Sequence, residues 1–323
     1  MAVPTCLAAS GASRSIVLLC AALTACTPAP PALQKHRLHA GRQARTHPNH
    51  SQPLLERVTT IPPVVLDYLI EDSSLNRWPT TARAHSVTPQ ERAIIAKTFA
   101  SLPPAVLAMA TKHIAGIYFV EDLGSSGWSE FLDPPSRQTF MVFDAVVLRD
   151  SANKWATRKE CSAFAAEDIS LELTAAGEDE PGGAFRFIFL HELGHAVAHA
   201  RRLVPSWIDR TGGEYAFASL VAGSKPFRPT VRFYAPSKQR IAAAQTNDIY
   251  AAWASSEYPT LYATVSAEED FAESFASYVH IQMLRQPYRI RIGAEIYENG
   301  ISQSRCALRR EFVAELFRRD EPW

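Results

Sequence analysis

The pattern of hydrophobic and polar residues separates a folded domain from an N-terminal segment that lacks such a pattern. Residues 26–63 are rich in proline and histidine and show little apolar periodicity. Such a segment cannot bury enough apolar surface to offset the entropy lost on folding, so we expect a disordered tether. From Val64 onward apolar residues recur at helical or strand spacing, and we place one domain at residues 64–323.

The first two helices of this domain are predicted from a local start signal. Thr88-Pro89-Gln90-Glu91 is typical of a helix N-terminus, with Thr88 as the N-cap and Glu91 at the third position. The helix that it begins is expected over Glu91–Ser101. A second helix is expected from Pro103 to about Thr111.

Two strands and three further helices complete the predicted elements. Ile114–Val120 and Thr139–Leu148 are rich in β-branched and aromatic residues, and the second is a nearly continuous apolar run, typical of a strand buried on both faces. Helical patterns follow Gly182-Gly183, extend from Ser266 to about Leu284, and return near Ser304–Arg319. We therefore expect an α+β fold with a small mixed sheet and a C-terminal helical part.

The N-terminal residues have the features of an export signal. Arg14 is their only charge, and Ser15–Leu23 is an apolar run too short to span a bilayer. The run ends in Leu23-Thr24-Ala25-Cys26, which resembles the lipobox of bacterial lipoprotein precursors. The resemblance implies that residues 1–25 are removed and that Cys26 carries the lipid anchor; a plain secretory signal is the alternative. Thr27 stands where the inner-membrane retention signal has Asp, so we expect a lipid-anchored envelope protein of the outer membrane.

Composition and charge exclude several classes of function. The 33 Lys and Arg balance 33 Asp and Glu, so no excess of cations is present to neutralise nucleic-acid phosphates. The chain contains neither G-x-G-x-x-G nor G-x-x-x-x-G-K-[ST], the glycine-rich loops that bind nucleotides. With 47% hydrophobic and 20% charged residues, its composition is that of a globular protein. We therefore expect no nucleic-acid partner.

The cysteines are consistent with export. Cys6 and Cys20 lie in the predicted signal, and Cys26 is the predicted lipidation site. Cys161 and Cys306 remain, and in an oxidising compartment these two could form a disulfide. Two separate buried thiols are the alternative.

The candidate chemistry lies in His191-Glu192-Leu193-Gly194-His195. On a helix, His191 and His195 lie on one face about 6 Å apart along the axis, so both imidazoles can bind one ion. Glu192 then lies beside them, in reach of a metal-bound water. This H-E-x-x-H arrangement is typical of zinc hydrolases. Gly194 permits the close approach of another backbone.

Catalytic zinc takes three protein ligands and keeps one open position. His199 continues the same helix face, but it lies about 12 Å from His191 along the axis, too far for one ion. We expect it to act as a cation near the helix C-terminus. The metzincin spacing would place a third histidine at position 201, which is Arg201. The third ligand is therefore expected to be an acidic residue on another helix.

The segment Glu269-Asp270-Phe271-Ala272-Glu273-Ser274-Phe275 supplies such a helix. With the H-E-x-x-H motif it resembles the gluzincin metallopeptidases, most closely the branch of anthrax lethal factor and the Pro-Pro endopeptidases. Asp270 stands where that branch has an aromatic residue. The resemblance implies a zincin-like metallopeptidase domain that holds one Zn²⁺ through His191, His195 and Glu269.

The same resemblance assigns roles to two more residues. It implies that Glu273 orients a ligand histidine, and that Tyr262, seven residues before Glu269, is catalytic. The stretch between the two motifs is longer than the branch leads us to expect. We interpret residues 200–260 as an insertion that shapes the cleft.

Other interpretations of this acidic cluster stay open. Ser266-Ala267-Glu268-Glu269 also fits a capping box, in which the Glu269 carboxylate would reach back to the N-cap amide instead of a metal. The ligand could be Glu268 or Glu273 instead, and Tyr258 is a nearby rival for the role of the tyrosine.

The activity predicted from these residues is that of a zinc-dependent endopeptidase of the bacterial cell envelope. Zinc lowers the pKa of its bound water towards about 7, and Glu192 accepts the proton and passes it to the leaving amine. Tyr262 would hydrogen-bond the oxyanion. Strand Thr139–Leu148 is the expected edge along which an extended protein or peptide substrate pairs. Two alternatives remain: a zinc-binding envelope lipoprotein without catalysis, and an amidase that acts on cell-wall peptides.

Overall fold

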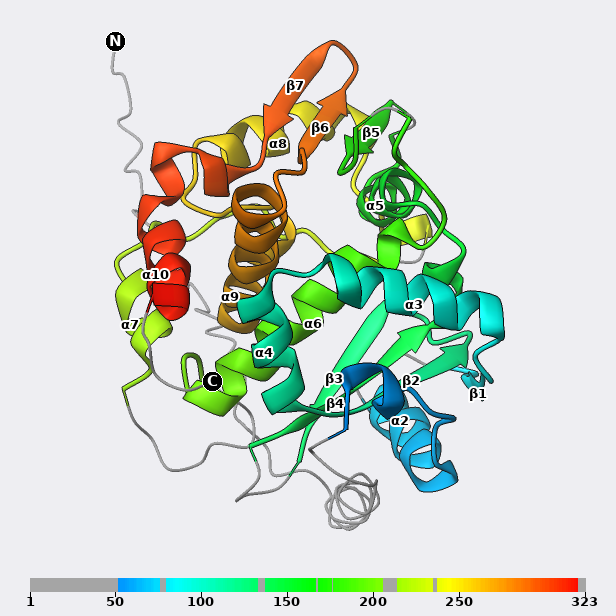
Figure 1. Cartoon of the computed structure of the whole chain (residues 1–323). Coiled ribbons are helices and arrows are strands. Elements are labelled where there is room, and N and C mark those ends of the chain that lie inside the picture. The colour runs from blue at the N-terminus through cyan, green and yellow to red at the C-terminus, as the bar shows by residue number, and fades with distance from the viewer. Residues whose placement is uncertain are drawn as a thin grey trace, which may run out of the picture.

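The computed structural model shows an α+β fold built on two sheets with helices around them (Figure 1). The structure describes residues 52–75, 80–132, 137–166, 168–175, 177–205, 214–234 and 237–318. The predicted signal at residues 1–25, the lipidation site Cys26 and the tether up to residue 51 lie outside the described residues.

A four-stranded mixed sheet forms one half of the molecule. Its strands are β1 (Arg83–Ala84), β2 (Ile114–Glu121), β3 (Gly127–Phe131) and β4 (Thr139–Asp144), in the order β1-β2-β4-β3. The central strands β2 and β4 are parallel, and the two outer pairs are antiparallel. Their mostly apolar sequences are explained by this central position, because both faces of each strand are buried.

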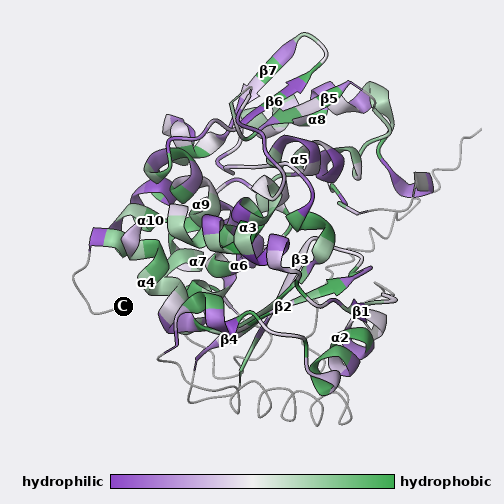
Figure 2. Cartoon of the chain, turned by 45° about the vertical axis from the view of Figure 1, so that its right-hand side comes forward, coloured by the Kyte–Doolittle hydropathy of each residue, from purple (hydrophilic) through white to green (hydrophobic). Residues whose placement is uncertain are grey.

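Helices cover both faces of this sheet. Helix α2 (Pro63–Leu75) packs on one face, where Tyr118 and Phe140 point. On the other face, Phe119 and Phe143 pack against the apolar start of α6 (Gly183–Arg201). The central strands between these layers are accordingly coloured mainly as hydrophobic in Figure 2. The sheet thus fixes the position of α6, the helix that carries the H-E-x-x-H motif. Two more helices lie in this half, α3 (Pro89–Ser101) and α4 (Pro104–His113).

Several predicted elements are confirmed. Thr88 accepts a hydrogen bond from the Glu91 amide, and the Glu91 carboxylate accepts one from the Thr88 amide, which completes a capping box at the start of α3. Strand β2 and helix α4 also lie where the pattern predicts them.

The predicted strand Thr139–Leu148 is wrong in its length and in its place. The strand ends at Asp144, whose carboxylate accepts hydrogen bonds from the amides of Val146 and Leu123, and Ala145–Leu148 continues as a 3-10 helix. Strand β4 also lies inside the sheet, so it cannot be the edge that receives a substrate. The edge strand on that side is β3.

The predicted domain boundary at residue 64 lies too far along the chain. Leu54–Arg57 forms a 3-10 helix, Leu54 and Val58 are buried, and Val58 bridges to Ile117 of β2. The Arg57 guanidinium donates to the backbone carbonyls of Thr111 and Ile114 at 2.5 and 2.6 Å. This segment is too short to show a periodicity, which is why the pattern assigned it to the tether.

The second half of the molecule is mainly helical, with a small three-stranded antiparallel sheet. That sheet has the order β5-β6-β7, with β5 at Ile169–Glu172, β6 at Arg289–Ile292 and β7 at Glu295–Glu298. Its helices are α5 (Ala152–Cys161), α7 (Ala216–Val221), α8 (Thr246–Ala254), α9 (Ala267–Ser277), which continues as a π-helix over Tyr278–Met283, and α10 (Ala307–Arg318). Short 3-10 turns lie at Ser237–Gln239, Ala243–Gln245, Tyr262–Thr264, Gly300–Ser302 and Ser304–Cys306.

Helices α6 and α9 touch backbone to backbone. A Cβ atom added at Gly194 of α6 would lie 2.8 Å from the Cα atom of Ala272 in α9, closer than real Cβ contacts. The small residues at both positions therefore let the two helices approach. Asp270 pairs with the buried Arg309 of α10, whose Nε and Nη2 atoms each lie 2.8 Å from a carboxylate oxygen. This ion pair fastens α10 to α9.

The cysteine pair predicted as a possible disulfide is not one. Cys161 ends α5 and lies near the Ile169 carbonyl, whereas Cys306 is buried and donates to the Glu257 carbonyl at 2.8 Å. The two residues are free thiols in separate surroundings, which is the alternative that the sequence left open.

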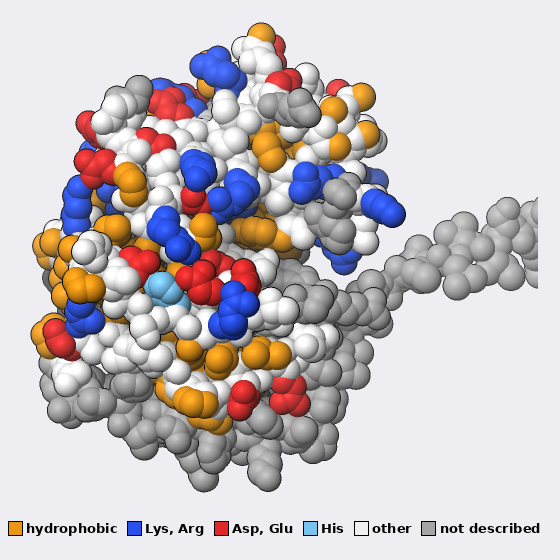
Figure 3. All heavy atoms as spheres, turned by 90° about the vertical axis from the view of Figure 1, so that its right-hand side faces the viewer, with side chains coloured by type: hydrophobic (Ala, Val, Ile, Leu, Met, Phe, Trp, Pro, Cys, Tyr) orange, Lys and Arg blue, Asp and Glu red, His pale blue; other side chains and the backbone are white. Residues whose placement is uncertain are grey.

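The surface carries charges of both signs. Arg83 pairs with Asp122 at 2.7 Å and Arg149 with Glu121 at 3.4 Å, and basic and acidic side chains are mixed over the face shown in Figure 3. Within the described part of the chain, no single helix is long and apolar enough to cross a bilayer. Helices α3 and α4 reach that length only as a pair, bent by 119°.

The contact at Gly194 gives a stability prediction. Overpacking a tight contact costs about 1–3 kcal/mol, whereas replacing a helical glycine by alanine returns about 1 kcal/mol. We therefore expect Gly194→Ala to lower the free energy of unfolding by up to about 2 kcal/mol in denaturant titration. Gly223→Ala is the control, because its Cβ would meet no heavy atom within 4 Å. Equal stability of the two variants would contradict the close packing of α6 and α9.

Candidate metal centre

Helix α6 presents the two histidines of the motif on one face. It begins after Gly182, whose φ of 83° suits glycine, and its first two turns are buried against the sheet. The Nε2 atoms of His191 and His195 are 3.2 Å apart. The helix therefore directs both imidazoles to one point, as the spacing predicts.

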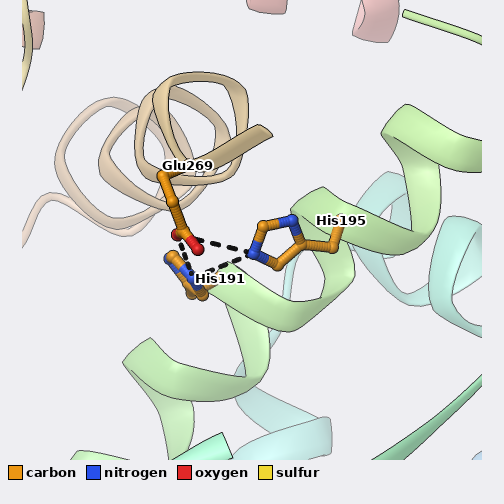
Figure 4. A group of neighbouring side chains, drawn as sticks. All are labelled: His191, His195 and Glu269. Carbon is orange, nitrogen blue, oxygen red and sulfur yellow. Dashed lines mark hydrogen bonds and ion pairs between the residues drawn. The ribbon is translucent and has the colours of Figure 1, made fainter. Parts of the chain in front are cut away.

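Helix α9 brings a carboxylate to the same point. Its N-cap is Ser266, whose hydroxyl accepts a hydrogen bond from the Glu269 amide at 3.1 Å. The Oε2 atom of Glu269 lies 3.1 Å from Nε2 of His191 and 3.6 Å from Nε2 of His195 (Figure 4). Ser266 thus caps the helix through its own side chain, while the Glu269 side chain faces the histidines.

These three atoms fit the ligand positions of one ion. Zinc bonds of about 2.0–2.1 Å in tetrahedral geometry place neighbouring ligand atoms about 3.3–3.4 Å apart, and the three distances of 3.2, 3.1 and 3.6 Å bracket that value. Within the described residues, the buried Oε2 atom of Glu269 has no hydrogen-bond partner besides these two imidazoles. Two imidazoles and one carboxylate form a donor set that suits zinc, so the residues present fit this metal.

Glu273 supports the site one turn further along α9. Its Oε1 atom lies 3.0 Å from Nδ1 of His191, and its side chain is fully buried. Burial favours its neutral form, but Lys159 and His191 outweigh this effect and lower the pKa of Glu273 to about 2. The resulting carboxylate favours a proton on Nδ1, which leaves the Nε2 lone pair of His191 directed at the ion position.

The protonation of the metal-free site follows from the same contacts. Burial lowers the pKa of His191, but the carboxylates of Glu269 and Glu273 have the larger effect and raise that pKa to about 10. The histidines in turn hold the pKa of Glu269 far below its usual range, against the effect of burial. Without a metal, a proton on His191 balances part of the negative charge.

The predicted base, Glu192, lies between α6 and the edge strand β3. Its side chain is 5% exposed, and a Cβ atom added at Gly127 would lie 2.7 Å from its Oε1 atom. A larger residue at this first position of β3 would displace the Glu192 carboxylate or the Ile188 side chain. The Glu192 carboxylate therefore lies against the first residue of β3.

Tyr262, which the sequence predicts to be catalytic, lies beside His191. Its ring centre is 5.8 Å from that of His191, and Phe233 packs edge-on at 5.0 Å. Burial and the surrounding carboxylates raise its pKa well above the ordinary value, so its hydroxyl stays a hydrogen-bond donor. The alternative residue Tyr258 instead packs against Arg309, whose guanidinium carbon lies 4.9 Å from the centre of the tyrosine ring.

A cleft of about 230 Å³ opens at these residues. One wall comes from β3 and the turn before it, where Ser126 accepts a hydrogen bond from the Trp155 indole at 2.7 Å and contacts the Tyr234 hydroxyl at 3.1 Å. Residues 200–260 contribute Val204 and Tyr234 to the lining. His199 lies in the last turn of α6, as expected. Its ring stacks on Phe131 with the ring centres 3.9 Å apart, and both residues line the cleft.

Several residues of this cleft could not be predicted from the sequence. Trp128 and Phe131 lie on a strand that was not predicted, and Lys159 lies on a helix whose polar sequence resembles a solvated one. For the two aromatic residues the available signal is the glycine-bounded segment 124–127, which indicates a turn with a further strand after it. Comparisons with protein-family models, with curated proteins and with solved structures found no match to this chain.

The geometry of the site predicts which carboxylate binds metal. We expect the chain to bind one zinc ion, measured by elemental analysis after dialysis, and Glu269→Gln to lower the affinity at least tenfold because it replaces the anionic ligand. Glu268→Gln is the matched control, because Glu268 directly precedes Glu269 but is not one of the three residues whose ligand atoms converge. A larger loss of zinc in Glu268→Gln than in Glu269→Gln would contradict the assignment.

The raised pKa of His191 predicts proton release on metal binding. At pH 8 His191 of the metal-free site is protonated, because its pKa is about 10, and zinc needs the neutral imidazole. Calorimetry in buffers of different ionisation enthalpy should then show release of at least one proton per zinc ion. Glu273→Gln, which removes one of the anions that raise this pKa, should release fewer. Binding heats that do not depend on the buffer would contradict the prediction.

Proposed function

We propose that this chain is a zinc-dependent endopeptidase of the bacterial cell envelope, with a zincin-like domain of the gluzincin type. The observation that carries the proposal is the convergence of His191, His195 and Glu269 beside the buried Glu192. Two helices far apart in sequence supply these ligands at distances that suit one zinc ion. When bound, the zinc ion supplies Lewis acidity to a water molecule and to the scissile carbonyl group.

Glu192 is the proton carrier in this proposal. It accepts a proton from the attacking water and passes it to the leaving amine. Its place between α6 and Gly127 supports this role, because the carboxylate lies against the strand that a substrate would follow. Tyr262 donates a hydrogen bond from its hydroxyl group to the oxyanion. Its raised pKa supports this role, because the phenol stays neutral and keeps its proton.

The edge strand β3 is the proposed place of substrate binding. It pairs with β4 on one side, and its other side borders the cleft. An extended peptide can add to such an edge through main-chain hydrogen bonds, while pockets beside the strand select its side chains. Phe131 and Ile188 give the cleft apolar walls. The substrate class is therefore a protein or peptide in extended conformation.

The envelope location rests on the sequence alone, through the lipobox-like residues that end in Cys26. Two other functions are compatible with the same ligands: a zinc-binding envelope lipoprotein without catalysis, and an amidase for cell-wall peptides. The cleft beside Glu192 favours a catalytic protein over the first of these. The choice between protein substrates and cell-wall peptides depends on a digest that contains both.

A peptide-library digest that includes cell-wall peptides tests the proposal. We expect cleavage by the zinc-loaded chain, and Glu192→Ala should lower kcat by about 10²–10⁴-fold while zinc stays bound, because the general base is lost and the ligands remain. Glu311→Ala, at an exposed position of α10, is the control and should cleave like the parent chain. Full activity of Glu192→Ala, or loss of its zinc, would contradict the role of Glu192.

A further inference from the structure

Lys159 of α5 is a buried cation at the back of the cleft. Its side chain is 6% exposed and lies among three aromatic rings, with Nζ 4.0 Å from the centre of Tyr262, 5.6 Å from Phe233 and 5.7 Å from Trp155. Burying an ammonium group is costly unless it is paired. A position of this kind would ordinarily hold an apolar residue, so the retained charge needs a reason.

The partner of Lys159 is the carboxylate that supports the metal site. Nζ lies 3.4 Å from Oε1 of Glu273, and the same oxygen lies 3.0 Å from Nδ1 of His191. One carboxylate oxygen therefore sits between the ammonium group and the imidazole. Lys159, Glu273 and His191 form a continuous line of contacts from α5 through α9 to the ion position on α6.

The contact with Tyr262 is the second link. The ammonium group lies over the face of the ring at 4.0 Å, within the range of a cation–π interaction. The same Tyr262 ring also packs near His191, with the two ring centres 5.8 Å apart. Lys159 thus touches both groups that flank His191, the carboxylate and the tyrosine, although it does not touch the ligand itself.

We propose that Lys159 is a positioning residue of the metal centre, which holds Glu273 against His191 and the ring of Tyr262 beside it. The inference rests on the proposed zinc site but not on peptide cleavage. Removing the ammonium group leaves Glu273 as a buried carboxylate without its counter-ion, so the carboxylate no longer keeps its place against His191. Substitutions that disturb such supporting contacts typically weaken metal binding about 10–100-fold.

Zinc affinity, measured by competition with a chromogenic chelator, tests this role. We expect Lys159→Met, which keeps the length of the side chain, to weaken zinc binding at least tenfold. Lys154→Met is the matched control on the same helix, because Lys154 is 70% exposed and its partner Asp150 keeps a second cation, Arg158. Its affinity should equal that of the parent chain. Equal affinities of Lys159→Met and the parent chain would overturn the proposal.

A double-variant cycle separates positioning from a general loss of structure. In Glu273→Gln the neutral amide needs no counter-ion, so adding Lys159→Met to it should change the zinc affinity by less than about threefold. The double variant removes both charges of the Lys159–Glu273 pair, so it can be compared with Glu273→Gln even if Lys159→Met alone does not fold; a loss of tenfold or more between these two would overturn the proposal. Equal losses from Lys159→Met in both backgrounds would overturn the proposal.

Steady-state kinetics on a cleaved peptide distinguish this role from substrate binding. A positioning residue lowers kcat with little change in KM, whereas a raised KM with unchanged zinc affinity would assign Lys159 to the substrate and overturn the inference. A chain that binds zinc in the expected order of variants but cleaves no peptide would contradict the proposed function and support the inference.

Discussion

The close contact between Gly194 of α6 and Ala272 of α9 is the constraint on which the candidate site depends. Two helices separated by more than sixty residues of chain meet there, with only the methyl group of Ala272 as a side chain at the contact. Glu269 lies one turn before Ala272 and His191 one turn before Gly194, so the approach of the helices sets the distance between carboxylate and imidazole. A bulkier pair of residues would separate the ligands without changing any of them.

Both helices are held in place from outside the site. The start of α6 is fixed by Phe185 and Phe189, which pack against the four-stranded sheet. Helix α9 is fastened on its far side by the ion pair of Asp270 with Arg309. Position 270 therefore carries an anchor that links α9 to the C-terminal helix.

The electrostatics of the site form an alternating series of charges. Lys159, Glu273, His191 and Glu269 follow one another at 3.4, 3.0 and 3.1 Å. Each buried charge thus has a partner of opposite sign, which is the condition for burying it at all. In the metal-free chain the proton on His191 completes the series. A divalent cation in its place would be held by the same two carboxylates, one directly and one through the imidazole.

The parts of the fold that local signals encode could be predicted from the sequence. The capping box at Thr88 and the four-residue spacing of His191 and His195 depend on residues within one or two turns of each other. Strand pairing is not local, so the edge position of β3 could not be read from five residues with little apolar character. Lys159 was missed for a similar reason, because Phe233 and Glu273, both distant in sequence, are what bury it. The distance between Cys161 and Cys306 likewise depends on the tertiary fold, so the sequence could not show that the two thiols stay unpaired.

The central claim is that α6 and α9 together form a zinc site with one position left for water. X-ray absorption at the zinc edge of the loaded chain tests it most directly, because it reports the number and type of the bonded atoms. The account predicts four light ligands, with two imidazole nitrogens at about 2.0–2.1 Å and at least one carboxylate oxygen. A sulfur ligand, a third imidazole, or a six-coordinate shell of oxygen atoms would contradict it.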